Sequence, residues 1–227
     1  MPDSMGTSRH DDLALRYVMS VPGGAPAGAE MPLVVVMHGR GADANDLADI
    51  APALDHGYRF VFPNAQKAFE AYPGMTLGYT WFDGWPPAGS AIVESRELLL
   101  RFIDEVVERY PTPAGKLIIS GFSQGALMSL DVGFRTAKKV AGIAVMSGAL
   151  YEPDLPDLRK AKDIPVLIVH GTDDDMIPVI AAWRTRRVLE DHGIEPEYHE
   201  FPMGHWVTPE SLAVVGEFMR RCLGSSE

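Results

Sequence analysis

The chain has 227 residues, of which 46% are hydrophobic and 22% are charged, a balance typical of a globular domain with a substantial core. The formal net charge of −11 disfavours nucleic acids and anionic membrane surfaces as partners, because both are bound through basic patches. It leaves room for one local basic patch around Arg184, Arg186 and Arg187. The only cysteine, Cys222, excludes an intramolecular disulfide and fits a reducing compartment.

The N-terminal segment, residues 1–12, is polar and lacks the apolar core of a secretory signal. We therefore expect it to be a flexible lead-in to the fold. No apolar run reaches the roughly 20 residues that a membrane-spanning helix needs, which predicts a protein without an integral membrane segment. The simplest expected location is the cytoplasm, and the chain is compatible with a monomer or a homodimer.

Short apolar runs alternate with longer amphipathic ones along the rest of the chain. Nearly continuous apolar runs are typical of parallel strands covered on both faces. The strand-like runs lie at 33–37, 58–62, 116–120, 140–146, 166–169 and, more weakly, 197–201. Helical periodicity marks 91–110, 123–136, 181–192 and 209–223. This alternation predicts a mostly parallel α/β sheet with helices on both faces, and without repeats or linkers we expect residues 13–227 to form a single domain.

Residues 65–90 fit neither pattern. Aromatic side chains stand among glycines and prolines there, namely Phe69, Tyr72, Tyr79, Trp81, Phe82 and Trp85. A loop of this length is usually a lid or a binding loop, and the alternative is a surface excursion whose aromatic rings pack on the body. Its position after the predicted strand at 58–62 favours the first interpretation, with Trp81 and Phe82 as candidate pocket residues.

The segment Gly-Phe-Ser-Gln-Gly at 121–125 follows a predicted strand and begins a predicted helix. Gly-x-Ser-x-Gly at such a junction is the signature of a nucleophile elbow, in which a sharp turn exposes the serine hydroxyl. Glycines flank the serine because a Cβ atom there would collide with the neighbouring strand or helix. Ser123 is therefore the candidate nucleophile.

A serine nucleophile needs a base, normally histidine, and a carboxylate that orients the base. In this fold they follow in the order serine, acid, histidine. Among the seven histidines, His205 lies in a glycine-containing loop after the last predicted strand and is the best candidate for the base. His38 and His170 each end a predicted strand before a glycine, where a structural hydrogen bond to a loop is the expected role.

Three consecutive aspartates, Asp173, Asp174 and Asp175, follow the predicted strand at 166–169 and offer the acid. Only one or two of them can face inward, and some aspartates after a strand serve only as turn formers. Aspartates beside His170 also suggest a metal site, but no other ligand has recognisable spacing and a serine elbow needs none. We therefore expect neither a metal nor a cofactor.

An oxyanion hole requires two backbone N–H groups. One is expected from Gln124, directly after the nucleophile, and the other from the loop after the strand at 33–37. His38-Gly39-Arg40-Gly41 occupies that loop, and its glycines allow close approach to a substrate.

Together these segments resemble the phospholipase/carboxylesterase family of α/β-hydrolases, which includes the acyl-protein thioesterases. The likeness runs from about Leu33 onward through the His-Gly-x-Gly loop, the Gly-Phe-Ser-Gln-Gly elbow, the segment from His170 to Pro178 and the Gly204-His205 pair. The Trp81-Phe82-Asp83 triplet is similar to the family pattern as well. The resemblance implies an α/β-hydrolase fold and selects Asp174 as the acid. In the resulting site we expect the N–H groups of Arg40 and Gln124 to hold the oxyanion.

These features predict a metal-free serine carboxylesterase that acts on short- to medium-chain acyl esters. The resemblance also implies thioesters and lysophospholipids as alternative small-molecule substrates of the same residues. A third hypothesis is a non-catalytic binding module on a hydrolase scaffold, which the presence of a candidate for each triad position disfavours.

Overall fold

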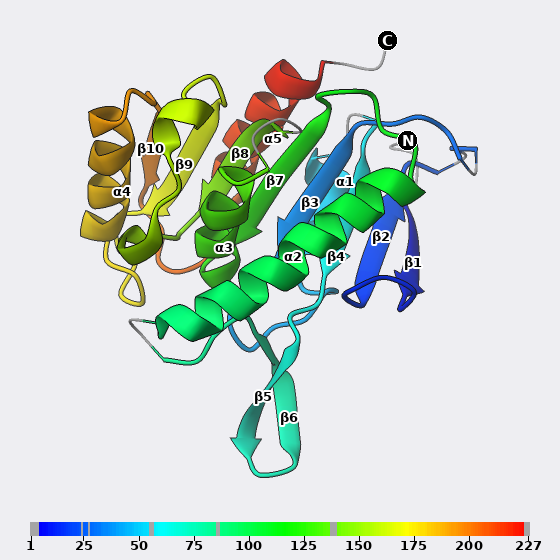
Figure 1. Ribbon diagram of the computed structural model, residues 1–227, viewed down its shortest axis with the longest axis horizontal. Coiled ribbons are helices and arrows are strands. Elements are labelled where there is room, and N and C mark those ends of the chain that lie inside the picture. The colour runs from blue at the N-terminus through cyan, green and yellow to red at the C-terminus, as the bar shows by residue number, and fades with distance from the viewer. Residues whose placement is uncertain are drawn as a thin grey trace.

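Within residues 5–23, 25–26, 28–54, 57–84, 87–136 and 140–224, which the computed structural model describes, the main sheet has eight strands (Figure 1). Their order across the sheet is β1-β2-β4-β3-β7-β8-β9-β10. The pairs β1–β2 and β2–β4 are antiparallel, and all pairs from β4–β3 to β9–β10 are parallel. The strands are β1 (Gly6–His10), β2 (Tyr17–Val21), β3 (Leu33–Met37), β4 (Arg59–Pro63), β7 (Leu117–Phe122), β8 (Val140–Met146), β9 (Val166–Gly171) and β10 (Glu197–Phe201). The predicted mostly parallel α/β sheet is thereby confirmed.

Helices cover both faces of this sheet, as Figure 1 shows. One face carries α2 (Gly89–Arg109), α3 (Gln124–Gly133) and α4 (Ile180–Asp191), and the other carries α1 (Ala51–Leu54) and α5 (Pro209–Leu223). Short 3₁₀ turns complete the connections: η1 (Ala48–Ile50), η3 (Glu152–Asp154) and η4 (Leu158–Ala161).

Alternate side chains of β3 explain why its sequence is apolar throughout. Val34 and Val36 belong to the core cluster that contains α5, whereas Leu33, Val35 and Met37 belong to the cluster that contains α2. Because successive residues of a strand point to opposite faces, a strand covered on both faces has no polar position.

The prediction of a flexible N-terminal lead-in is wrong for residues 6–10. This segment forms edge strand β1, which pairs antiparallel with β2 from Gly6 opposite Val21 to His10 opposite Tyr17. The hydrophobicity pattern does not predict this strand, because backbone hydrogen bonds to β2 hold it and it has no apolar face. Residues 1–4 of the predicted lead-in lie outside the described part of the chain.

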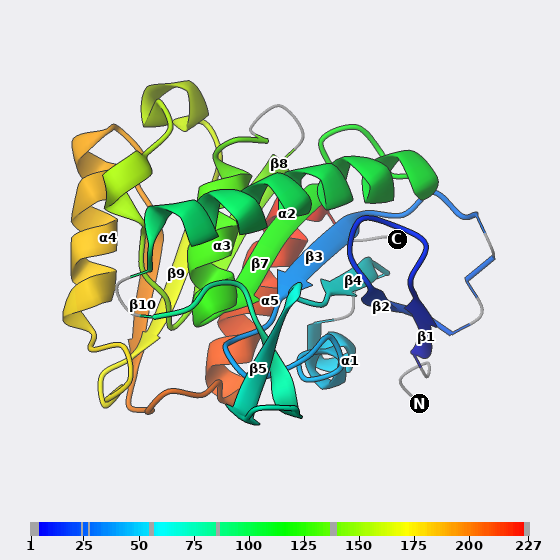
Figure 2. The same cartoon turned by 60° about the horizontal axis from the view of Figure 1, so that its bottom comes forward.

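The prediction of a long loop over 65–90 also needs correction. β5 (Lys67–Tyr72) and β6 (Met75–Thr80) form a two-stranded hairpin that projects beyond the end of the main sheet (Figures 1 and 2). Gly74, with a φ angle of 83°, closes the turn after Pro73, and this pair of residues is favoured at such turns. Trp85 lies outside the described residues.

The parallel strands β3, β7, β8 and β9 end at the same edge of the sheet, the edge from which the β5–β6 hairpin projects (Figure 1). In open α/β sheets, ligands bind at the carboxyl ends of the strands. The loops after these four strands therefore define where a functional site is to be sought.

Candidate active site

Ser123 lies in the sharp turn between β7 and α3. Its backbone angles, φ 57° and ψ −117°, belong to a region that residues with a side chain rarely occupy. The two elbow glycines make the turn sterically feasible. A Cβ atom at Gly121 would lie 2.4 Å from the carbonyl oxygen of Gly125, and one at Gly125 would lie 2.0 Å from that of Met37. The strand and the helix therefore pack together too closely for any side chain there.

His205 joins Ser123 to Asp174. Its Nε2 atom lies 2.8 Å from Oγ of Ser123, and its Nδ1 atom lies 2.7 Å from Oδ2 of Asp174. The three residues come from three loops, after β7, β9 and β10, so the sheet brings together positions far apart in the chain. This geometry suits transfer of the Ser123 proton to His205 while Asp174 holds the imidazole in the required tautomer.

The loop after β9 presents only one of its three aspartates to His205. Asp174 is buried, whereas Asp173 and Asp175 are exposed. The second carboxylate oxygen of Asp174, Oδ1, accepts hydrogen bonds from the backbone N–H groups of Met176 at 3.0 Å and Ile177 at 2.8 Å. These donors fix the orientation of the carboxylate and compensate for its burial.

His170 and His38 make the structural hydrogen bonds expected of them. Nε2 of His170 lies 2.8 Å from the carbonyl oxygen of Ile177 and 3.5 Å from Oδ2 of Asp174, so this buried ring supports the loop that carries Asp174. The other described histidines, His10, His192 and His199, bond elsewhere, and His56 lies outside the described residues.

The loop after β3 passes directly beside Ser123. A Cβ atom placed on Gly39 would lie 3.3 Å from that of Ser123. Among the described residues, the backbone N–H groups of Arg40 and Gln124 have no hydrogen-bond acceptor, so both are free to bind a ligand. The Arg40 side chain points away over the Phe69 ring, 4.7 Å from its centre.

The ring of His38 fixes the peptide that carries the Arg40 N–H group. The backbone N–H of Ala65 donates to Nε2 of His38 at 3.1 Å, so Nδ1 carries the proton and donates to the carbonyl oxygen of Gly39 at 2.7 Å. Burial lowers the pKa of His38 below its ordinary value, against smaller opposing effects of the Gly39 carbonyl and of Asp43.

Trp81 and Phe82 do not line an open pocket, contrary to the sequence-based prediction. Both side chains have no exposed surface and belong to the core cluster beneath α2. Aromatic residues among glycines and prolines look loop-like in sequence, but these two lie where the chain returns from the hairpin into the core.

A largely apolar cavity of about 310 Å³ lies between α3, α4 and the loop after β8, and the paired side chains of Arg184 and Glu152 form its charged part. Leu127, one helical turn after Ser123, forms part of its wall, and Ala149, Leu150 and Ala181 form further parts. Gly148, next to Ala149, packs against the Ser123 backbone, since a Cβ atom at 148 would lie 3.2 Å from the Ser123 carbonyl oxygen. An apolar wall this close to the serine suits a hydrocarbon group.

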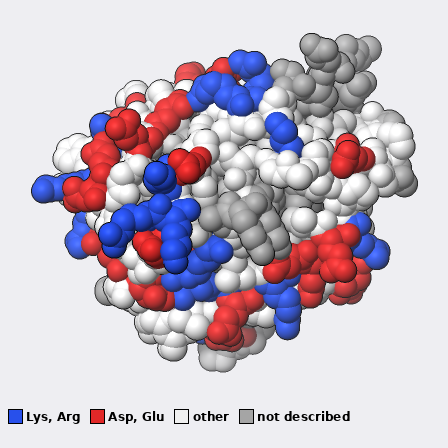
Figure 3. All heavy atoms as spheres, turned by 45° about the horizontal axis from the view of Figure 1, so that its top comes forward, with Lys and Arg blue, Asp and Glu red and all other residues white. Residues whose placement is uncertain are grey.

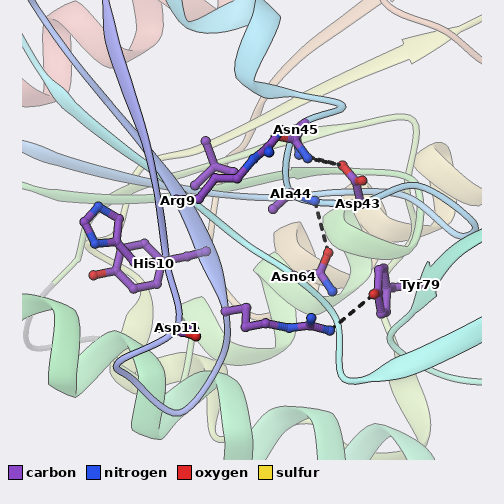
Figure 4. Close-up of a pocket in the computed structure, with 11 residues that line it drawn as sticks. Arg9, His10, Asp11, Asp43, Ala44, Asn45, Asn64 and Tyr79 are labelled. Carbon is purple, nitrogen blue, oxygen red and sulfur yellow. Dashed lines mark hydrogen bonds between the residues drawn. The ribbon is translucent and has the colours of Figure 1, made fainter.

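A second cavity, of about 380 Å³, lies on the other side of the loop after β3 (Figure 4). Arg16 donates to the Tyr79 hydroxyl at 3.2 Å across it, and Asn64 accepts from the backbone N–H of Ala44 at 3.2 Å. Its lining is more polar than that of the first cavity and includes Arg9, Asp11 and Asp43, so it offers less apolar surface to a hydrocarbon group.

Acidic and basic side chains lie next to one another on the face shown in Figure 3. In the predicted basic patch, Arg184 pairs with Glu152 and Arg186 pairs with Glu190, so these two charges are compensated. In the described part of the chain, no cluster of histidine, cysteine and carboxylate side chains is arranged to hold a metal ion. No described helix is both long enough and apolar enough to cross a membrane.

Comparison with known proteins identifies the family. Residues 24–223 match the model of the Phospholipase/Carboxylesterase family. The chain is 26% identical over 215 residues to acyl-protein thioesterase 1 of Saccharomyces cerevisiae, covering 85% of this chain and 93% of that protein. It is 30% identical over 172 residues to acyl-protein thioesterase 1 of Debaryomyces hansenii, covering 70% and 74%.

Solved structures agree in fold. Esterase PE8 superposes with a TM-score of 0.76 at 27% identity, over 97% of this chain and 100% of that one. A carboxylesterase from Mesorhizobium loti superposes with a TM-score of 0.81 over 94% and 98%, and at 19% identity this likeness shows the fold alone. With its central sheet, its serine elbow and the match over residues 24–223, this chain belongs to the phospholipase/carboxylesterase family of α/β-hydrolases.

Proposed function

We propose that this protein is a serine hydrolase that cleaves carboxylic esters of short- to medium-chain acyl groups through an acyl-enzyme intermediate. The observation that carries the proposal is the position of His205, with Nε2 at 2.8 Å from Ser123 and Nδ1 at 2.7 Å from Asp174. Family membership supports hydrolase chemistry, and the apolar cavity of about 310 Å³ beside α3 supports a small acyl group, because it lies at the lower end of the roughly 300–1,000 Å³ typical of ligand pockets.

The reaction begins when Oγ of Ser123 attacks the acyl carbonyl carbon and its proton passes to Nε2 of His205. The carbonyl oxygen becomes an oxyanion, which accepts hydrogen bonds from the free N–H groups of Arg40 and Gln124. Asp174 stabilises the imidazolium formed at His205. The imidazolium then gives its proton to the leaving alcohol as the carbon–oxygen bond breaks.

The acyl group is now bonded to Ser123. Water donates a proton to His205 and attacks the acyl carbon, and a second oxyanion forms in the same place. Its collapse breaks the bond to Ser123 Oγ, which recovers its proton from His205. The carboxylic acid leaves, and no metal or cofactor takes part in the cycle.

Replacement of the nucleophile tests this function. Ser123→Ala should lower kcat/KM on p-nitrophenyl butyrate by about 10³-fold or more and abolish labelling by a fluorophosphonate probe. Ser129→Ala is the matched control, because Ser129 is buried in the same helix and its hydroxyl donates to the Gly125 carbonyl, with no bond to His205. Full esterase activity in Ser123→Ala would disprove the assignment, and wild-type protein that neither hydrolyses the ester nor takes the label would instead indicate a non-catalytic binding module.

Thioester hydrolysis is a second candidate, favoured by the relatives that are named acyl-protein thioesterases. The same residues would act, since only the leaving atom changes from oxygen to sulfur. Measuring kcat/KM on oxygen and thiol esters of the same acyl group separates the two candidates. A lysophospholipid with the same acyl group extends the comparison to the third class of substrate.

A further inference from the structure

One buried residue, Trp81, contacts both sides of the proposed oxyanion hole. Its indole Nε1 donates a hydrogen bond of 2.8 Å to the carbonyl oxygen of His38, in the loop that carries the Arg40 N–H group. Its backbone N–H donates at 3.2 Å to Oε1 of Gln124, the residue that supplies the other N–H group. Along the chain, 83 residues separate the two donors, at positions 40 and 124. Their relative position therefore depends on contacts made by the fold.

Two successive peptide groups link Trp81 to the Arg40 N–H. The indole holds the carbonyl of the peptide between His38 and Gly39, and the His38 ring holds the carbonyl of the next peptide, between Gly39 and Arg40. Because a peptide group is planar, fixing the Gly39 carbonyl also fixes the direction of the Arg40 N–H. The rings of Trp81 and His38 lie in contact, with centres 5.3 Å apart.

The whole amide side chain of Gln124 is bound to the segment around Trp81. Its Oε1 atom accepts from the Trp81 backbone N–H and lies 2.9 Å from the Thr80 hydroxyl, and its Nε2 atom donates to the Phe82 carbonyl at 2.9 Å. Gln124 is the first residue of α3, so these bonds fix the first turn of the helix, where the free N–H lies.

The segment itself has little freedom to move. Trp81 and Phe82 have no exposed surface, and the Trp81 carbonyl accepts a hydrogen bond from the Ser95 hydroxyl of α2. A rigid element bound to two separate donors sets the distance between them, which an oxyanion hole requires because its donors must already be in place when the charge develops.

We propose that Trp81 is a positioning residue that holds the N–H groups of Arg40 and Gln124 at the separation that an oxyanion needs. The proposal rests on the proposed function, since it assigns these groups to the oxyanion. It differs from a purely structural role of Trp81 in one respect: loss of the indole N–H alone, with the ring size unchanged, lowers the rate of the chemical step.

The test replaces Trp81 by 3-benzothienylalanine, which keeps the shape of the ring and puts sulfur in place of the N–H group. Trp81→Phe is a second, natural variant. With p-nitrophenyl butyrate we expect kcat to fall about 10- to 100-fold, the scale of effect of a misplacement of about 1 Å, while KM changes less than about twofold. The pH midpoint of kcat/KM should not move, because His205 is untouched.

Phe60→Leu is the matched control, because Phe60 is an equally buried core residue that makes none of these contacts and belongs to the cluster on the opposite face of the sheet. It should lower the melting temperature without lowering kcat at 20 °C. Hydrogen exchange followed by mass spectrometry supplies a readout independent of activity. Both Trp81 variants should speed exchange in peptides that cover 38–42 and 123–127, and Phe60→Leu should not.

The outcomes separate this proposal from the proposed function. If the wild type hydrolyses the ester and the benzothienyl variant keeps its kcat, the role of Trp81 is overturned, and unchanged exchange in both peptides overturns it as well. If exchange rises in both peptides but the wild type hydrolyses neither ester nor thioester, the link made by Trp81 stands and the proposed function fails.

Discussion

Oδ2 of Asp174 lies 2.7 Å from Nδ1 of His205, while Oδ1 of the same carboxylate accepts two backbone N–H groups of its own loop. One oxygen therefore bonds to His205, and the other bonds to the loop that carries Asp174. This division explains how the buried carboxylate keeps its orientation.

Asp174→Asn should lower kcat on p-nitrophenyl butyrate by about 10³- to 10⁴-fold, because the amide stabilises neither the required tautomer nor the imidazolium of His205. Asp173→Asn and Asp175→Asn are controls at exposed neighbouring positions and should keep kcat within roughly twofold. Steady-state kinetics of the three purified variants, with circular dichroism to verify folding, decides the matter. If either control lost more kcat than Asp174→Asn, the acid would be that other aspartate and not Asp174.

Ala181→Phe should shift the acyl preference toward shorter chains, because the added ring occupies the apolar cavity between α3 and α4. The ratio of kcat/KM for p-nitrophenyl octanoate to that for p-nitrophenyl acetate is expected to fall about tenfold or more. The octanoyl chain would lose the contacts of several methylene groups with the cavity wall, whereas the acetyl group has no such methylenes. Arg187→Phe adds the same side chain at an exposed position of α4 and should leave the ratio unchanged. An unchanged ratio in Ala181→Phe would place the acyl group outside this cavity.

Gly78→Ala should impair catalysis from within the hairpin. A Cβ atom at position 78 would lie 2.0 Å from the Gly41 carbonyl oxygen, so the loop beside Ser123 must move. The base of the hairpin is bonded to this loop through Tyr79, whose carbonyl accepts from Gly41 and whose N–H donates to Ala42, each at 2.8 Å. We expect kcat to fall at least roughly tenfold.

The control for this variant is Gly6→Ala, where the nearest atoms would be 4.0 Å from the new Cβ. It should retain both kcat and melting temperature. Wild-type kcat in Gly78→Ala would show that the hairpin and the loop after β3 are not mechanically coupled.

Acidification should destabilise the protein through His38. Burial lowers the pKa of this histidine in the folded state. Below the ordinary pKa of about 6.5, His38 is therefore protonated in the unfolded chain while it stays neutral in the folded one. The free energy of unfolding therefore falls as the pH drops below about 6.5, by up to about 1.4 kcal/mol per pH unit from this one group, until the pH reaches the folded-state pKa.

Urea unfolding between pH 7.5 and 5 measures this dependence. His38→Asn keeps a side-chain N–H donor but does not titrate, so it should be less stable than the wild type at pH 7.5 and lose less stability on acidification. Parallel pH dependences of the two proteins would refute the assignment.

Asp131→Asn should lower the free energy of unfolding by about 3 kcal/mol, because it removes the buried carboxylate charge that Arg96 and Arg135 share and leaves them the exposed Asp154 as their remaining carboxylate partner. Asp131 accepts two hydrogen bonds from Arg96, at 2.7 and 3.0 Å, and these side chains are only 3% and 10% exposed. The pair joins α3 to α2. Glu217→Gln breaks an exposed pair with Arg220 and should cause no measurable change in the urea midpoint, so equal effects of the two substitutions would contradict this reasoning.

The sequence predicted the interior of the sheet better than its periphery. β3, β7, β8 and β9 are covered on both faces, so nearly all of their residues are apolar. Such an apolar run can be recognised from a short stretch of sequence. β1 and the β5–β6 hairpin carry mostly polar or exposed side chains and are held by backbone pairing with distant segments. No local pattern records such contacts.

The same distinction applies to the site. Ser123 follows from a local motif and His205 from its place after the last strand, whereas choosing Asp174 from three adjacent aspartates required the family resemblance. The pocket assignment of Trp81 and Phe82 is wrong because composition does not indicate which way a side chain points. Their actual surroundings depend on Gln124 and His38, each about 40 residues away in the chain.

The left-handed backbone of Ser123 also has a thermodynamic consequence. Holding a residue with a Cβ atom at φ 57° and ψ −117° costs on the order of 1–3 kcal/mol, and Ser123→Ala retains that cost. Ser123→Gly relieves it, with a smaller opposing loss because glycine gives the unfolded chain more freedom. The glycine variant should therefore melt at a higher temperature than the alanine variant, which would show that the serine backbone at the proposed nucleophile lowers the stability of the fold.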